Sequence, residues 1–316
     1  MTIDQITEEI KNAQKIVILT HESPDGDAIG SSLALYLGLK QAGKDADVII
    51  PEISKIYNFL PGIESIKKES NIEKYDVAIA LDCGDIKRLN GWSNYFESAK
   101  VKISIDHHIS NTMFGDINYV NHVSPATAQI LITVLESLGI NLTKDICTCL
   151  ATGIITDTGG FKYPNTTAET FEFMSELIGK GINISNIYRQ AFDLISIERF
   201  NLNKVALERM EFLEQGKIAF TYITTEDEKA TNVKPGEHEG IVNFGQNIEG
   251  VEISILLRQT EGGFKVSLRS VSYVNVSDVA LMFGGGGHYR ASGCIIMSTL
   301  EEAKQKIIEE ARKHLK

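Results

Sequence analysis

The stretch ISIDHHIS at residues 103–110 joins an apolar run to three consecutive polar residues, Asp106, His107 and His108. An apolar run that stops in this way is typical of a buried strand that has reached its end. Neighbouring side chains on a strand point to opposite faces, and an unpaired buried charge is costly, so these residues would build a poor core. We therefore expect them to lie at the end of a strand and to serve a function outside the core.

Three similar apolar runs precede this one, at residues 15–20 (KIVILT), 47–50 (DVII) and 75–82 (YDVAIALD). Between the first two lies a helical pattern that stops at Gly43. Near-continuous apolar strands that alternate with helices predict an α/β fold, with a first domain built on a parallel sheet covered by helices on both faces. In such sheets, ligands bind beyond the carboxyl ends of the strands.

The pattern turns helical after the fourth strand, with Ser124 in a suitable place for an N-cap. Strand patterns return in the last third of the chain and include a hairpin with its turn around Gly262 and Gly263. A capping box from Ser298 to Glu301 opens a terminal helix. We expect a first domain at 1–190, a helical connector at 191–214, and a smaller α/β domain with a mixed sheet at 215–316.

Composition and charge limit the classes of protein to consider. The 316 residues are 43% hydrophobic and 23% charged, as in a soluble globular protein long enough for two domains. The net charge of -11 disfavours binding to long duplex DNA, which draws on many contacts between Lys or Arg and phosphates. A nucleic-acid substrate should therefore be short and held by a local basic patch.

The first twenty residues carry acidic side chains where a secretory signal needs a basic flank, and no apolar run approaches the roughly 18 residues of a membrane span. We therefore expect a cytoplasmic protein with no membrane segment. The four cysteines, which include no CxxC pair, are expected to be free thiols: Cys83, Cys147, Cys149 and Cys294.

Ionisable residues follow each clear strand of the first domain and also occur in one helix. The segments are THESPDGDAIG, LDCGD, IDHH and GIITDTGGF, which supply His21, Asp25, Asp27, Asp82, Asp85, Asp106, His107, His108 and Asp157. If the strands are parallel neighbours, most of these side chains converge on one edge of the sheet. For Asp85 alone, a turn or a helix cap is the expected role.

Carboxylates packed together suppress one another's ionisation unless cations neutralise them. Asp oxygen mixed with His nitrogen suits manganese, iron, cobalt or zinc, so the convergence predicts divalent metal. With this many ligands and an Asp able to bridge, we expect two ions about 3.5 to 4 Å apart, which could activate a water and clamp a phosphoryl oxygen.

The four segments match, in order and spacing, the motifs of the DHH phosphoesterase superfamily, and GGGGHYRASG resembles the GGGH signature of its associated C-terminal domain. The resemblance implies that His21, Asp25 and Asp82 hold one ion. It implies that Asp27, Asp82, His107 and Asp157 hold the other, with Asp82 as the bridge and manganese as the usual metal. His108 would face the scissile phosphate as a donor or acid, and Asp106 would orient a histidine.

The C-terminal glycine run could let a ligand approach the backbone closely and offer N–H groups to an anion, although a flexible turn has the same composition. Arg258 and Arg269 could pair across adjacent strands as a phosphate-binding patch, but each could equally form a surface salt bridge. The expected substrate-binding residues are Arg258, Arg269, Gly285, Gly286, Gly287, His288 and Arg290.

The superfamily also includes pyrophosphatases and single-strand exonucleases. The glycine-rich ending disfavours the former, and the short acidic chain disfavours the latter. The resemblance is instead to enzymes that hydrolyse very short oligonucleotides (nanoRNA and dinucleotides) or 3′-phosphoadenosine 5′-phosphate (PAP), using water activated by two metal ions. It also makes a homodimer possible. The alternatives left open are a phosphodiesterase for cyclic dinucleotides and a noncatalytic nucleotide sensor.

Overall fold

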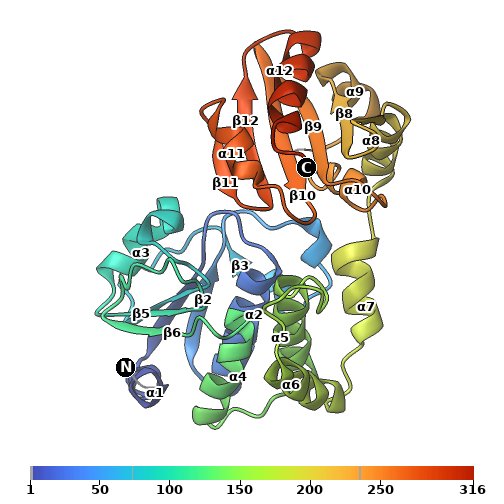
Figure 1. Ribbon diagram of the computed structural model, residues 1–316. Coiled ribbons are helices and arrows are strands. Elements are labelled where there is room, and N and C mark those ends of the chain that lie inside the picture. Colours follow the sequence, from blue (N-terminus) through green and yellow to red (C-terminus); the bar gives the residue numbers. More distant parts are fainter. Residues whose placement is uncertain (1–2, 73, 235) are drawn as a thin grey trace. The chain divides into compact units, whose positions relative to one another are not determined.

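The computed structural model describes residues 3–72, 74–234 and 236–316 (Figure 1). The chain divides into two compact units, Met1–Leu194 and Ile195–Lys316. The stretch 191–214, expected to be a helical connector, is split between them: the second unit takes helix α8 (Ile197–Glu208) and also a strand, β7 (Glu211–Leu213).

The first unit is built on a six-stranded sheet in the order β3-β2-β1-β4-β5-β6, with every neighbouring pair parallel. This confirms the predicted parallel sheet. Its strands are β1 (Lys15–Leu19), β2 (Asp45–Ile49), β3 (Ile66–Lys67), β4 (Val77–Leu81), β5 (Val101–Asp106) and β6 (Ile117–Val120). The strand order runs outward in both directions from the neighbours β1 and β4, so the topological switch point lies between these two strands.

Helices cover both faces of this sheet, as the apolar runs predicted. Along β1, Ile16 and Ile18 pack into the cluster that includes α2 (Gly26–Gln41), α4 (Thr127–Ser137) and α5 (Lys144–Asp157), which lie together in Figure 1. Val17 and Leu19 point the other way and pack with Phe96 of α3 (Ser93–Ser98). Because both sets are buried, the strand shows no polar alternation. The unit's other helices are α1 (Ile3–Asn12), α6 (Ala168–Gly179), α7 (Ile184–Tyr188), a π-helix (Arg189–Asp193) and three 3₁₀ helices (Lys55–Tyr57, Ile63–Ser65, Ile86–Trp92).

The predicted end of α2 is confirmed, whereas the predicted start of α4 is wrong. The helix before Gly43 ends as expected, since α2 stops at Gln41 and Gly43 has φ +70°. The N-cap prediction at Ser124 was wrong, because α4 begins at Thr127 and Ala126 occupies its cap position. The free N–H groups there bind a carboxylate from another helix, so a local capping side chain is not needed.

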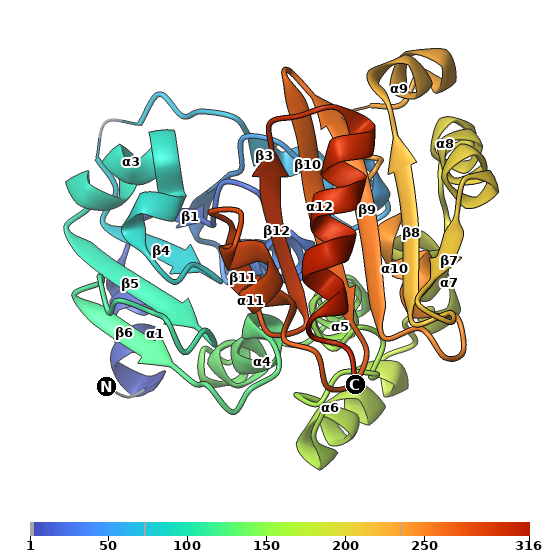
Figure 2. The same cartoon turned by 45° about the horizontal axis from the view of Figure 1, so that its top comes forward.

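The second unit has a mixed six-stranded sheet in the order β11-β12-β10-β9-β8-β7, in which only the β8–β9 pair is parallel. Its strands beyond β7 are β8 (Ile218–Ile223), β9 (Ile253–Thr260), β10 (Gly263–Ser270), β11 (Gly286–His288) and β12 (Ala291–Ile296). Helices α11 (Val276–Leu281) and α12 (Leu300–Arg312) cover one face, and Figure 2 shows α12 lying along it. Helices α8, α9 (Thr225–Thr231) and α10 (Val242–Gln246) lie next to strands β8 and β9.

The predicted hairpin is present, but its register differs from the one expected. Thr260 pairs with Gly263 across the two-residue turn Glu261-Gly262, which places Lys265 opposite Arg258. Arg258 and Arg269 are therefore not directly paired, because Arg269 lies opposite Ser254, but the register places both side chains on the same face of the sheet.

The terminal helix was also predicted one residue early. Thr299 caps α12 by accepting the Glu302 N–H, whereas Ser298 had been expected to cap it. The predicted free thiols are confirmed, since all four cysteines are buried and unbridged. In the described part of the chain, no helix combines the length and apolar character needed to cross a membrane.

Candidate active site

The ionisable residues that follow the strands meet at the switch point of the first sheet. His21 comes two residues after β1, Asp82 directly follows β4, and Asp106 is the last residue of β5, followed by His107 and His108. Because β1, β4 and β5 are parallel neighbours, their carboxyl ends lie side by side. The site is therefore where ligands bind in open parallel sheets.

Asp82 lies at the centre of this group and is only 1% exposed. Its φ of +53° is unusual outside glycine, and its N–H donates to the Ile105 carbonyl on β5 at 3.1 Å. This backbone turn brings the carboxylate within 3.8 Å of Nε2 of His21 and within 3.5 Å of Nε2 of His107. One carboxylate thus stands between two imidazoles from different strands.

Asp27 is fully buried, and both of its oxygens accept backbone hydrogen bonds from the start of α4. The donors are the N–H groups of Thr127 at 2.6 Å and Ala128 at 2.8 Å. Asp25 caps its own helix instead, accepting the N–H groups of Asp27 and Ala28. The helix starts of α2 and α4 therefore fix the two carboxylates of the DGD sequence.

The imidazole of His107 is oriented on both sides. Its Nδ1 donates to the Ser124 carbonyl at 3.3 Å, which leaves Nε2 facing Asp82 and Asp157. The distance from Nε2 to the Asp157 carboxylate, at the end of α5, is 3.3 Å. A carbonyl on one nitrogen and carboxylates near the other is the arrangement expected of a metal-binding histidine.

Asp106 is wholly buried and accepts three hydrogen bonds. They come from the His107 N–H at 2.8 Å, Nδ1 of His108 at 2.7 Å and Nδ2 of Asn111 at 2.7 Å. These bonds tie the His107 backbone, the His108 ring and the Asn111 side chain to one buried carboxylate. With Nδ1 of His108 bound to Asp106, Nε2 of that ring remains available to a ligand.

Two side chains in this network were missed by the sequence analysis. Asn111 follows Asp106 by five residues in a turn, and Thr127 donates its hydroxyl to Asp82 at 3.2 Å. Asn111 lies outside the helices and strands, and Thr127 lies in a predicted helix whose pattern does not mark its hydroxyl. Asp85, in contrast, has the predicted capping role, because it accepts the Lys87 N–H at the start of a 3₁₀ helix.

Within the described ranges, ligand-type atoms gather in three overlapping groups near this point. The groups are His21, Asp25 and Asp82; Asp27, His107 and Asp157; and Asp82, Asp106, His107 and His108. The first two bring together the six side chains expected to bind metal. The third joins Asp82 and His107 to Asp106 and His108.

The electrostatics of the group call for a cation. Burial, followed by the charges of Asp82 and Asp157, raises the pKa of Asp27 well above its usual range. Burial and Asp82 likewise raise the pKa of Asp157 to about 7, although His107 lowers it. Burial alone would lower the pKa of His107, yet the hydrogen bond to Asp82 and the surrounding carboxylates raise it to about 10. A proton on His107 therefore provides the positive charge that a metal ion would supply.

The residues present fit divalent metal ions. The donors are carboxylate oxygen and imidazole nitrogen, a mixture that suits manganese and its neighbours in the first transition row. Nδ1 of His21 is also buried with no hydrogen-bond partner among the described residues, which is uncommon for a polar atom in a core.

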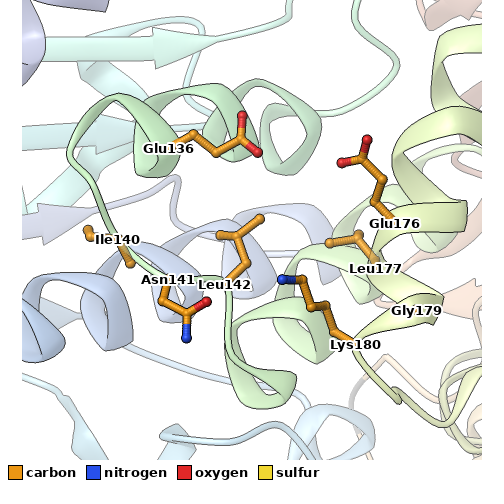
Figure 3. Close-up of a pocket in the computed structure, with 8 residues that line it drawn as sticks. All are labelled: Glu136, Ile140, Asn141, Leu142, Glu176, Leu177, Gly179 and Lys180. Atoms are coloured by element: carbon orange, nitrogen blue, oxygen red, sulfur yellow. The ribbon is translucent and has the colours of Figure 1, made fainter.

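A pocket in the first unit lies away from this group. It encloses about 580 Å³ at the far end of α4 from Asp27, and in Figure 3 Glu136 of α4 and Glu176 of α6 extend toward the opening from opposite sides. Leu142 and Leu177 form an apolar floor, and Lys180 supplies one positive charge. An 11-residue helix is about 16 Å long, so this pocket is separate from the ligand-type group.

The second sheet leaves one face open over β10, β12 and β11, and its strand register shows which residues share that face. Directly paired residues point the same way, so Arg269, Ala291 and His288 form one row. Ser267, Gly293 and Gly286 form the next, and Arg258, Lys265 and Ile295 form a third. We call these three rows the open face.

The open face is basic around a row of small residues. A cavity of about 320 Å³ at its β9 side is lined by Arg258, Lys265 and Arg269, together with His238. Arg258 and Lys265 are directly paired, although like charges opposite each other destabilise a sheet. Glu228 lies 3.5 Å from Arg258 and offsets part of this repulsion. Lys265 and His238 were not singled out from the sequence.

The glycines of the GGGGH run differ in what the fold requires. A Cβ on Gly285 would lie 2.2 Å from the Gly293 carbonyl oxygen, and one on Gly287 would lie 2.6 Å from that of Ala291. Gly286 has an ordinary φ and open space where a Cβ would be, and it lies on the open face. The fold therefore explains Gly285 and Gly287, but not Gly286. Arg290 lies in the turn after His288 and donates to the Ser272 carbonyl.

Comparison with known proteins agrees with this geometry. A family model described as the DHH family, N-terminal domain, matches residues 15–154, and the DHHA1 domain model matches residues 215–316. The bifunctional oligoribonuclease and PAP phosphatase NrnA of Thermus thermophilus is 34% identical over 304 residues, covering 95% of this chain and 90% of that protein. The chain belongs to the DHH family.

Other DHH relatives match along nearly the whole chain. A probable bifunctional oligoribonuclease and PAP phosphatase NrnA of Streptococcus mutans is 27% identical, with 98% of each chain covered. The crystal structure of an exopolyphosphatase-related protein from Bacteroides fragilis superposes with a TM-score of 0.88 at 33% identity, covering 98% of this chain and 95% of that one. The sequence resemblance to the DHH superfamily is thus confirmed over both units.

Proposed function

We propose that this protein hydrolyses phosphate esters of very short oligonucleotides and of 3′-phosphoadenosine 5′-phosphate. The observation that carries the proposal is the gathering of five ligand-type side chains around one buried carboxylate, Asp82, at the switch point of a parallel sheet: His21, Asp25, Asp27, His107 and Asp157. The names of the Thermus thermophilus and Streptococcus mutans relatives support both substrate classes.

In this proposal the site holds two divalent metal ions, with manganese as the first candidate. His21, Asp25 and Asp82 would hold one, while Asp27, Asp82, His107 and Asp157 would hold the other. Such a pair lowers the pKa of a bound water and offsets charge on a phosphoryl oxygen. The chain's own part is to hold the ligands in place, through the α4 N–H groups on Asp27 and the Ser124 carbonyl on His107.

His108 is the proposed acid for the departing oxygen. The hydrogen bond from Nδ1 to Asp106 fixes the ring and raises the pKa of His108 above its usual value, which favours the protonated form that a general acid needs. Asn111 holds the other oxygen of Asp106, so the carboxylate cannot rotate away. Asp106 is then a positioning residue and does not contact the substrate.

The open face of the second unit is the proposed nucleotide-binding surface. Arg258, Lys265 and Arg269 supply positive charge for phosphates in a protein that is otherwise acidic. Gly286 leaves room for a base or sugar to approach the backbone, and His288 borders that row. The supports for Gly285, Gly287 and Arg290 are weaker, because the fold already gives each of them a structural role.

A hydrolysis panel with Mn²⁺ tests the proposal. It compares a dinucleotide, 3′-phosphoadenosine 5′-phosphate, cyclic diadenylate and pyrophosphate, with and without a chelator. We expect the first two to have the highest kcat/KM and the chelator to abolish turnover. Preference for the cyclic dinucleotide or for pyrophosphate would contradict the substrate assignment, and binding without turnover of any of them would favour a noncatalytic sensor.

We also propose that the protein acts in the cytoplasm, as the acidic first twenty residues suggest, and that it forms a homodimer, as the family resemblance implies. Sedimentation of the purified protein at micromolar concentration measures the oligomeric state. A monomer across that range would contradict the dimer without affecting the assignment of the site.

A further inference from the structure

The ring of Tyr163 lies flat on the backbone of a glycine beside the metal-ligand group. A Cβ on Gly159 would fall 2.4 Å from Cζ of Tyr163 and 2.6 Å from both Cε1 and Cε2, which places it over the face of the ring. Any side chain at position 159 would displace the ring. One face of Tyr163 is therefore seated against Gly159.

The backbone of this loop holds the ring in a fixed place. Gly159, Gly160 and Phe161 have φ values of +57°, +69° and +66°, so three consecutive residues are in the left-handed region. The Tyr163 N–H donates to the Thr158 carbonyl at 3.0 Å and closes the turn. Such conformations persist only where the surrounding structure determines them.

An aromatic cluster supports the loop from behind. The ring of Phe161 lies 5.2 Å from that of Phe171 and 6.3 Å from that of Tyr188. Tyr188 also packs on Gly160, where a Cβ would come within 2.9 Å of its ring. The loop is thus held by ring packing on one side and carries the Tyr163 ring on another.

Much of the Tyr163 side chain is left uncovered. The residue is 57% exposed, and in the described part of the chain no aromatic ring packs against it. A large aromatic group that is held rigidly but left uncovered suits a planar ligand, because the ordering cost has been met in advance.

The position of the Tyr163 ring, close to a candidate metal ligand, indicates which kind of planar ligand it could contact. Asp157 precedes Gly159 by two residues, so their Cα atoms are at most about 7.6 Å apart. Asn165, in the same loop, donates to the Asp157 carbonyl at 3.1 Å and so ties the loop to the end of α5. A phosphate at the metal-ligand group would have its own nucleoside within reach of the Tyr163 ring.

We propose that Tyr163 is a base-stacking platform for the nucleotide whose phosphate is hydrolysed. The inference rests on the proposed function and extends it, by assigning a residue of the first unit that recognises a base. Stacking on an aromatic ring tolerates any base, because every base has a π-face. The platform therefore gives affinity for nucleotides without a preference for sequence.

Two substitutions separate the effect of the aromatic ring of Tyr163 from the effect of its size. Tyr163→Phe keeps the ring face, while Tyr163→Leu keeps an apolar group on Gly159 and removes the ring. We expect Tyr163→Phe to change kcat/KM for a dinucleotide less than twofold and Tyr163→Leu to lower it about five- to hundredfold, the range of one stacked base. Phe212→Leu, at another exposed aromatic position on β7, should have no effect.

Dinucleotides that lack one base distinguish stacking from a structural role of Tyr163, because a structural role would affect intact and abasic substrates equally. If Tyr163 stacks on a base, removal of that base should cost the wild-type enzyme about as much as Tyr163→Leu costs with the intact substrate, and the variant should then be indifferent to the base. An equal loss for Tyr163→Leu on intact and abasic substrates at both positions would overturn the platform. So would full activity of Tyr163→Leu on the intact dinucleotide.

A binding measurement keeps this inference apart from the proposed function. A non-hydrolysable dinucleotide that contains 2-aminopurine should lose fluorescence on binding to the wild type and to Tyr163→Phe, and lose far less on binding to Tyr163→Leu. Quenching by wild type without turnover of the natural dinucleotide would contradict the proposed hydrolysis and support the platform. Turnover with equal quenching by all three proteins would contradict the platform alone.

Discussion

Nδ1 of His108 lies 2.7 Å from Oδ1 of Asp106, a carboxylate that is wholly buried at the end of β5. The same carboxylate also accepts hydrogen bonds from the His107 N–H and from Asn111. One buried group therefore orients a candidate metal ligand and a candidate acid through the backbone and the ring of consecutive residues. These shared hydrogen bonds give a physical reason for the crowding of Asp106, His107 and His108 in the sequence.

Replacing Asp106 by Asn should lower kcat about 10- to 100-fold while leaving KM and bound manganese nearly unchanged. The amide retains the shape of the carboxylate, but its NH₂ group replaces one oxygen and cannot accept the hydrogen bonds made there, either those of His107 and His108 or that of Asn111. The substitution also removes the charge that raises the pKa of His108. Steady-state kinetics and metal analysis of the same preparation provide the measurement. Loss of manganese from Asp106→Asn would show instead that Asp106 is itself a ligand.

Asp82→Asn should remove the response of the protein to metal. Asn tolerates the positive φ at this position, so the substitution removes charge with little backbone strain. In wild type, Mn²⁺ should raise the melting temperature, because it binds the folded state and holds together carboxylates that repel each other. In the variant we expect no rise on addition of Mn²⁺, and no hydrolysis. A normal rise would exclude Asp82 as the bridging ligand, whatever the activity.

The sheet of the first unit could be predicted because its strands are buried on both faces, which leaves uninterrupted apolar runs such as KIVIL and VAIAL. The site followed from the same observation, since polar residues at parallel strand ends must meet at one edge. The start of α4 could not be predicted, because its capping group is Asp27, which is 100 residues away from Thr127. Local sequence carries no trace of that contact.

In the second unit the strand register of the β9–β10 hairpin could not be predicted, because it depends on which two residues form the turn. Counting outward from Glu261-Gly262 places Lys265 opposite Arg258, and a turn centred one residue later changes every partner. Tyr163 went unnoticed for a related reason, because its place is set by the left-handed run at Gly159 and Gly160. A lone Tyr in a polar loop has no periodicity that would identify it.

Two neighbouring glycines should respond in opposite ways to alanine. Gly286→Ala should fold normally, because a Cβ there meets open space, and should raise KM for dinucleotide severalfold by narrowing the open face. Gly285→Ala should destabilise the second unit by about 1–3 kcal/mol, because its Cβ would overlap the Gly293 carbonyl. Thermal unfolding and kinetics distinguish the two effects. An unchanged KM for Gly286→Ala would remove Gly286 from the nucleotide-binding surface.

Lys265→Gln should make the protein slightly more stable and a weaker binder of nucleotide. The substitution removes a charge directly opposite Arg258, so we expect a gain of about 0.2–1 kcal/mol in the free energy of unfolding. KM for dinucleotide should rise severalfold, and the rise should shrink at high salt as charges are screened. Lys306→Gln, the same change on α12 at the other face of the sheet, should leave KM unaltered. A loss of stability in Lys265→Gln would mean that the lysine was paired and not held in place for a ligand.

Glu252 should make the stability of the second unit depend on pH in the acid range, and this dependence should not involve metal. Its buried carboxylate accepts the hydroxyl and N–H of Ser272 and the N–H groups of Tyr273 and Val274, and so fixes the loop after β10. Burial alone would raise the pKa of Glu252, but these hydrogen bonds outweigh it and hold the pKa below the usual 4.5. The stabilisation is therefore complete above that value and is lost as the pH falls through the lower pKa of the folded state.

Glu252→Gln should accordingly lower the free energy of unfolding at neutral pH by about 1–3 kcal/mol, because its NH₂ group meets N–H donors. Urea unfolding of the second unit, followed from pH 7 downward, should show a constant gap between wild type and variant that narrows below about pH 4.5. Glu261→Gln, in the exposed hairpin turn, should show no gap at any pH. A gap that stayed constant into acid would mean that Glu252 stabilises the loop through packing, since loss of its charge would then cost nothing.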